Sequence, residues 1–205
     1  ERHGGLAMLL TETTTAAAEA LPVAAFRAHL RLGTGLADET LQDGLLEAHL
    51  RAALAAIEGR TGKVLLARDF LLRLTAWRGP GAEQALPVAP VASVLSVSLF
   101  TVDDREIPLA ASGWRLVRDR HRPKIVPTAS VLPTVPQGGR IEIRFEAGFG
   151  PDWASVPADL AQAVMLLAAD YYETPSEPGP AGAGLPWPAP RLIERWRTVR
   201  APGRR

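Results

Sequence analysis

Residues 141–173 read IEIRFEAGFGPDWASVPADLAQAVMLLAADYYE, and the spacing of their apolar residues changes within this stretch. From Ile141 to Glu146 apolar and charged residues alternate, which is the pattern of a β-strand with one buried face. After Pro157 the apolar residues recur at the spacing of one helix face, at Leu160, Val164, Leu167 and Tyr171. Asp159 lies in the first turn of this helix, where the helix dipole favours an anion. The stretch predicts a strand followed by an amphipathic helix, and a fold of the α+β class.

Two further helices are predicted before this stretch. Residues 22–32 begin with a proline at a plausible first helical position and end before Gly33. Residues 39–61 end before Gly62 and carry an apolar stripe made of Leu46, Leu50, Ala53, Leu54 and Ile57. Each helix has one apolar face, so we expect the helices to pack on one another.

Residues 64–148 lack helical spacing and instead show short runs of alternating apolar residues. Turn signals separate these runs at Gly79-Pro80-Gly81, Asp103-Asp104 and Gly138-Gly139. This pattern predicts a small antiparallel β unit inserted between the second and third helices. We therefore predict an N-terminal arm over residues 1–21. A core is predicted over residues 22–173, with helices at 22–32, 39–61 and 157–173 and a β insertion at 64–148.

An extended C-terminal tail follows the predicted core. Residues 174–190 contain six prolines and three glycines, which is typical of a linker. Residues 191–205 are basic, and Leu192, Trp196 and Val199 recur at helical spacing among arginines. So short a helix is marginal alone and exposes its apolar face unless it docks on another part of this chain or on a partner. Both alternatives remain open from the spacing.

Composition excludes several classes of protein. The 205 residues include no cysteine, which rules out a disulfide scaffold and a thiolate metal site. Lys and Arg number 23 against 22 Asp and Glu, so the whole chain has no strong field for nucleic acid or membranes. The four histidines show no metal-binding spacing, and no nucleophile motif occurs. We predict no catalytic residue, no cofactor, no metal and no membrane contact.

One local cluster of cations stands out in the β region. It consists of Arg115, Arg118, Arg120, Arg122 and Lys124, interrupted among its charges only by Asp119. Such a cluster can bind phosphate backbones without sequence preference. It is also what a solvated hairpin would carry, and the pattern slightly favours this second interpretation.

Five segments in fixed order resemble the bacteriophage head-tail connector (adaptor) family, which includes the adaptors of phage-like gene transfer agents. The segments are AFRAHLRL (25–32), AAIEGRTGKVL (55–65), LPVAPVASVLSV (86–97), IEIRFEAGFG (141–150) and VPADLAQAVMLLAADYYE (156–173). The resemblance implies a mainly helical core, that of a helical-bundle adaptor, with a β insertion. It implies assembly as a ring of commonly twelve copies. It also implies a structural protein rather than an enzyme.

The resemblance further implies where the protein acts and what it contacts. The ring would lie beneath the portal in the neck of a virion or phage-like particle, continue the DNA channel, and join the head to a stopper or tail-terminator protein. Packaged DNA would pass through it without specific contacts, and assembly would take place in the bacterial cytoplasm. The C-terminal segment would dock on the portal through Arg191, Leu192, Ile193, Arg195, Trp196, Arg197, Val199 and Arg200. The cluster from Arg115 to Lys124 would face the DNA channel or a subunit interface.

Two alternatives belong to other classes of function. The first is a nucleic-acid-binding accessory protein that acts through its arginine-rich segments, which salt-dependent DNA affinity of the isolated chain would favour. The second is an unrecognised enzyme, which an acid–base constellation in a cleft would favour.

Overall fold

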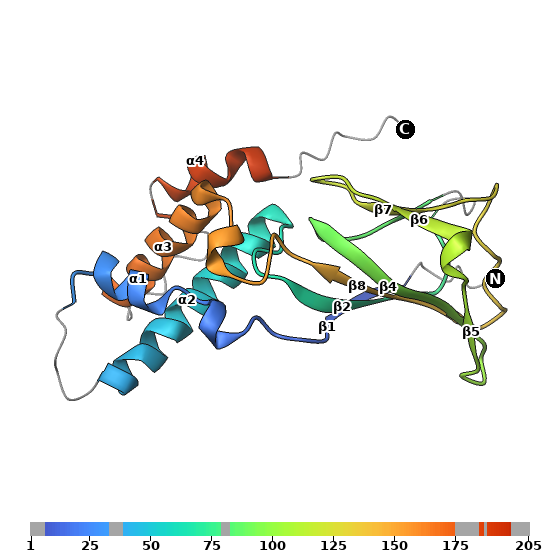
Figure 1. The fold of residues 1–205 in the computed structure, drawn as a ribbon, viewed down its shortest axis with the longest axis horizontal. Coiled ribbons are helices and arrows are strands. Elements are labelled where there is room, and N and C mark those ends of the chain that lie inside the picture. Colours follow the sequence, from blue (N-terminus) through green and yellow to red (C-terminus); the bar gives the residue numbers. More distant parts are fainter. Residues whose placement is uncertain (1–6, 33–38, 79–82, 175–184, 187, 198–205) are drawn as a thin grey trace. The chain divides into compact units, whose positions relative to one another are not determined.

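A computed structural model describes residues 7–32, 39–78, 83–174, 185–186 and 188–197 (Figure 1). The chain divides into two compact units. The β unit comprises Glu1–Thr15 and Ala67–Phe149, and the helical unit comprises Ala16–Leu66 and Gly150–Arg205. Each unit is therefore built from two separate stretches of chain.

The β unit contains a five-stranded antiparallel sheet with the strand order β1-β2-β8-β4-β5. Its strands are β1 (Met8–Glu12), β2 (Arg68–Leu74), β4 (Val91–Phe100), β5 (Glu106–Pro108) and β8 (Arg140–Ala147). Strand β8 is central, and Ile141, Ile143 and Phe145 of its predicted buried face are fully buried. The predicted alternation is incomplete, because Glu142 on the other face is buried too. The Phe145 ring stacks on Phe70 of β2 with 5.6 Å between ring centroids.

On this sheet the buried carboxylate of Glu142 binds two arginines, Arg73 and Arg140. Glu142 of β8 is only 5% exposed, and its Oε1 accepts hydrogen bonds from Arg73 Nε and Arg140 Nε, each at 2.9 Å. Burial raises the pKa of the Glu142 carboxyl, but the hydrogen bonds and charges of both arginines outweigh burial and leave its pKa below the ordinary value. The carboxylate is thus held in its charged form by its two guanidinium partners.

A second antiparallel sheet has the order β3-β7-β6. Its strands are β3 (Gln84–Ala85), β6 (Trp114–Val117) and β7 (Lys124–Pro127). Strands β6 and β7 form a hairpin in which Val117 lies opposite Lys124. The turn of this hairpin carries most of the cations that the sequence analysis singled out.

The helical unit is formed by α1 (Val23–His29), α2 (Glu39–Thr61), α3 (Ala158–Glu173) and α4 (Ala189–Ile193), with short 3-10 turns at Ala18–Ala20, Trp153–Ser155 and Glu194–Trp196. Helix α2 packs on α1 and α3. The predicted stripe of α2 is buried, and so are Leu160, Val164 and Leu167 of α3. Gly62 ends α2 with φ +67°, a conformation that a residue with a Cβ rarely adopts.

The prediction of a mainly helical core is wrong. In the part of the chain that the structure describes, four α-helices accompany eight strands in two antiparallel sheets, so helix and sheet share the fold. Most strands are short and are stabilised by pairing with strands far along the chain. The spacing of apolar residues within one strand does not indicate such pairing. Strand β1 is an example, because its five residues are mostly exposed and do not alternate, yet all five pair with β2.

Candidate functional site

The C-terminal tail contains a docked segment, which we define as residues 188–197. Helix α4 (Ala189–Ile193) continues as a 3-10 turn over Glu194–Trp196, and α4 packs on α3 (Figure 1). Of the predicted portal-binding residues, the segment contains Arg191, Leu192, Ile193, Arg195, Trp196 and Arg197. Val199 and Arg200 lie outside the described residues.

The apolar face of the docked segment is buried within the helical unit. Ala189 is fully buried, and Ile193 and Trp196 are 3% and 2% exposed. Burying a large apolar side chain contributes about 1.5–3 kcal/mol relative to leaving it in water. Of the two alternatives that the spacing left open, docking on the same chain is therefore the one seen in this structure.

Asp159 holds the docked segment through one carboxylate oxygen. Trp196 Nε1 and Arg195 Nε both donate to Asp159 Oδ2, each at 2.7 Å. The Arg195 guanidinium also lies 4.9 Å from the centroid of the Trp196 ring, within reach of a cation–π contact. Because the indole N–H is satisfied by a carboxylate, Trp196 can be buried without leaving an unpaired donor.

The charge of Asp159 is stabilised in place. Partial burial raises the pKa of its carboxyl, but the hydrogen bonds from Arg195 and Trp196 outweigh burial and leave the pKa below its ordinary value. A lowered pKa means that docking favours the ionised carboxylate. The contribution of Asp159 to docking is thus fully present above the ordinary pKa and is lost as the pH falls through the lowered one.

Acidification should therefore release the docked segment. We expect the Trp196 indole N–H resonance to move toward its solvent-exposed position as the pH falls below the ordinary Asp pKa of about 3.9. Asp159→Asn is the matched control, because an amide can still accept the indole hydrogen bond but has no proton to gain. A resonance with the same pH dependence in wild type and Asp159→Asn would contradict a role for this carboxylate.

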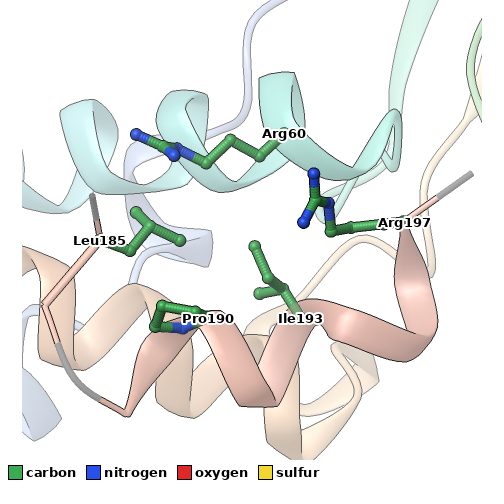
Figure 2. A pocket seen from close by; sticks show the side chains of 5 residues that line it. All are labelled: Arg60, Leu185, Pro190, Ile193 and Arg197. Carbon is green, nitrogen blue, oxygen red and sulfur yellow. The ribbon is translucent and has the colours of Figure 1, made fainter. Parts of the chain in front are cut away.

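A pocket of about 290 Å³ lies beside the docked segment (Figure 2). Arg60 borders it from the last turn of α2, and Pro190 and Ile193 border it from α4 on the other side, with Leu185 and Arg197 completing the lining. Both arginines are exposed, while Ile193 supplies a buried apolar surface. We call this the arginine pocket, since it combines two guanidinium groups with three apolar side chains.

The five cations of the predicted basic cluster all lie on the β6–β7 hairpin, which we call the basic hairpin. Asp119 Oδ1 shapes its turn by accepting the backbone N–H groups of His121 and Arg122, each at 2.7 Å. Arg118 Nη2 donates to Ala92 O at 2.9 Å, and Lys124 forms an ion pair with Glu83. The hairpin thus uses part of its charge for contacts within the β unit. The exposed cations include Arg115, Arg120 and Arg122.

No three His, Asp or Glu side chains gather as metal ligands would in the described ranges. No helix within those ranges is long and apolar enough to span a bilayer.

Comparison with solved structures gives close similarity over nearly the whole chain. A chain from the neck of an empty gene transfer agent (GTA) particle, computed with C6 symmetry, is 55% identical with a TM-score of 0.87, covering 96% of this chain and 99% of that chain. A chain from the virion of a native GTA particle is 53% identical with a TM-score of 0.83, covering 95% and 98%. A chain from the neck of a native GTA particle with C12 symmetry is 50% identical with a TM-score of 0.81, covering 96% and 99%.

Comparison with protein-family models and with curated proteins finds no match. The structural relatives alone decide the assignment, because half or more of the residues are identical across nearly the full length of both chains. Similarity of this extent confirms the family indicated by the order of the five sequence segments. The chain belongs to the head-tail connector family of gene transfer agents.

Proposed function

We propose that this chain is an adaptor in the neck of a gene transfer agent particle, where it joins the head to the next component of the tail. The observation that carries the proposal is the 50–55% identity to neck and virion chains of such particles over at least 95% of this chain. As a member of this family the chain is a structural component of the neck. Its role is therefore to supply shape and contacts rather than to catalyse a reaction.

In this proposal the chain acts as a ring of copies, which the sixfold and twelvefold symmetry of the related necks supports. In a closed ring of identical copies, neighbouring copies meet through a heterologous interface, in which one surface of the chain contacts a different surface of the next copy. A ring of twelve copies would surround the packaged DNA and continue its channel. Portal, stopper and DNA are its proposed partners, with assembly in the bacterial cytoplasm.

The proposed portal contact is the docked segment with the residues that follow it. Arg191, Arg195 and Arg197 are exposed on this segment, where carboxylates or carbonyl oxygens of a partner can reach them. Ile193 and Trp196 are buried against the chain's own helical unit. They would reach the portal only if the segment left α3, so while the segment is docked the portal contact falls to its exposed arginines.

Binding to purified portal tests this contact. We expect a chain truncated after Pro190 to lose portal binding, because it lacks the whole arginine-bearing part of the segment. Arg191→Ser combined with Arg197→Ser should weaken binding while leaving Trp196 in place, and a Glu173→Ser variant serves as the control for an exposed charge on α3. Unchanged association of the truncated chain with the portal would refute the proposed contact.

A second candidate function is non-specific contact with DNA through the basic hairpin. The exposed positions of Arg115, Arg120 and Arg122 favour it. If these side chains bind phosphates, Arg120→Ser with Arg122→Ser should flatten the salt dependence of duplex DNA affinity. Equal salt dependence in wild type and this variant would leave the hairpin as a surface for protein contacts or solvent.

We expect the purified protein to be a monomer or a weak oligomer that forms rings only on the portal. Of the exposed large apolar residues in the described ranges, Leu45 lies in the helical unit and the others lie on separate strands and loops of the β unit: Met8, Leu9, Leu95, Val102, Ile107 and Val131. Scattered apolar residues of this kind do not make the continuous surface of an obligate interface. Light scattering at micromolar concentration measures the mass, and a stable dodecamer in isolation would contradict this expectation.

A further inference from the structure

The turn between β4 and β5 presents a short, fixed hairpin tip. Thr101 N donates to Arg105 O, Asp104 N donates to Thr101 O, and Arg105 N donates to Thr101 Oγ1, each at 3.1 Å. Asp104 adopts a left-handed conformation with φ +59° and pairs with Arg140 of β8. This is the geometry of a tight hairpin loop closed by a left-handed residue. The tip is thus held in one conformation by its own backbone and by the sheet below it.

The two residues at the tip combine an apolar side chain with a carboxylate. Val102 is 69% exposed, the highest value among the large apolar residues that are exposed in the described ranges. Asp103 beside it is also exposed, whereas the next carboxylate, Asp104, is engaged by Arg140. A surface valine next to an acidic residue offers a partner one apolar and one anionic group at adjacent positions.

The arginine pocket has the complementary chemistry. Its apolar wall consists of Leu185, Pro190 and Ile193, and its cations are Arg60 and Arg197 (Figure 2). A volume of about 290 Å³ is ample for a valine side chain. A guanidinium binds a carboxylate strongly, because two parallel N–H groups match the two carboxylate oxygens. An apolar wall is of no use to a phosphate backbone, so the pocket suits an acidic and apolar peptide better than DNA.

We propose that Val102 and Asp103 of one copy enter the arginine pocket of the neighbouring copy in the ring, whose docked segment stays on α3. This inference rests on the proposed ring function and assigns two of the surfaces that form the ring. The tip and the pocket are different surfaces, so each copy donates one and accepts the other, as a heterologous interface requires. Because the turn is already ordered, binding loses little conformational freedom at the tip.

Cysteine cross-linking tests the contact directly, since the chain contains no native cysteine. Asp103→Cys and Arg60→Cys are placed in two chains with different tags, which are mixed and added to portal-bearing particles that lack this protein. We expect a disulfide-linked pair carrying both tags, formed only when both variants are assembled on particles. The matched control replaces Asp103→Cys with Ser130→Cys, at an exposed loop residue of the same unit, and should give no such pair.

Charge exchange provides a second measurement that does not depend on a disulfide. Asp103→Arg and Arg60→Asp should each lower occupancy of the neck about tenfold, which corresponds to about 1.4 kcal/mol, and the double variant should restore it. Asp103→Glu and Arg60→Lys retain the charges and should assemble nearly as well as wild type. If either substitution lowered occupancy by misfolding the chain, the double variant would misfold as well. Restored occupancy therefore indicates a direct contact between the two positions.

The outcomes separate this contact from the ring itself. If the cysteine variants enter the neck but give no mixed pair, or if the double charge variant fails to recover, the contact is refuted while the ring function stands. A cross-link from the Arg60→Cys variant to another neck protein would also refute it, because the pocket would then belong to a different partner. If the wild-type chain does not enter the neck, both the ring function and the contact fail.

Discussion

Trp196→Ala is expected to detach the docked segment from α3 while the rest of the helical unit remains folded. The substitution removes the largest buried side chain of the segment and leaves Asp159 without its indole donor. Truncation of a buried tryptophan to alanine typically costs about 3–5 kcal/mol, and the only other buried residues of the segment are Ala189 and Ile193. Hydrogen exchange should show amides of residues 189–196 losing protection, while those of α2 and α3 retain it.

Arg191→Ala is the matched control on the same segment, because Arg191 is exposed and its loss leaves the buried face intact. Its exchange pattern should stay close to that of wild type. Retained protection of residues 189–196 in Trp196→Ala would show that α4 docks without its aromatic anchor. A detached segment would also let portal binding be measured without the competing contact on α3.

Gly139→Ala is expected to destabilise the β unit by about 3 kcal/mol, at the upper end of what overpacking usually costs. Gly139 lies in the turn before β8, where its N–H donates to Pro136 O at 2.9 Å. A Cβ at this position would lie 2.1 Å from Phe100 O and 3.0 Å from Pro136 O. Both obstacles are backbone atoms, so the clash cannot be relieved by a change of rotamer. Chemical denaturation of the full chain would measure the loss.

Gly113→Ala provides the comparison within the same unit. A Cβ at Gly113 meets nothing within 4 Å, so this substitution should change stability by less than about 1 kcal/mol. Equal stability of the two variants would mean that the approach of Phe100 O to Gly139 is not a constraint on the fold.

The elements that the sequence predicts well are those whose stability comes from their own spacing of apolar residues. The alternation of β8 and the long stripe of α2 belong to this kind, since each marks its buried face within one short stretch of chain. Strand β1 and the short strand β5 show no such spacing. They form because β1 pairs with β2 and β5 pairs with β4. The spacing placed three helices close to their observed bounds, so the mainly helical core was wrong because it gave too little weight to the two sheets.

The sequence indicates some residues of the candidate site but not the contacts between them, for a similar reason. The sequence singled out Asp159 for its place in the first turn of α3 and Trp196 for its helical spacing. Their hydrogen bond joins residues 37 positions apart across a proline-rich stretch, and no local pattern encodes such a pair. The arginine pocket needed the structure as well, because Arg60 comes from α2 and its other walls come from the C-terminal tail. The sequence carries no cluster of cations around Arg60, because Lys63 is the one other cation within five residues of it.

The division of the helical unit between two distant stretches of chain has a consequence for synthesis. Helix α2 ends at Thr61, whereas α3, on which it packs, begins at Ala158. A ribosome adds about 5–20 residues per second, so the roughly 100 residues between these helices take on the order of 5–20 s to translate. Strands β2 to β8 emerge in that interval, while α2 still lacks α3, on which it packs. The nascent chain therefore passes through a period in which α2 is a natural target for chaperones.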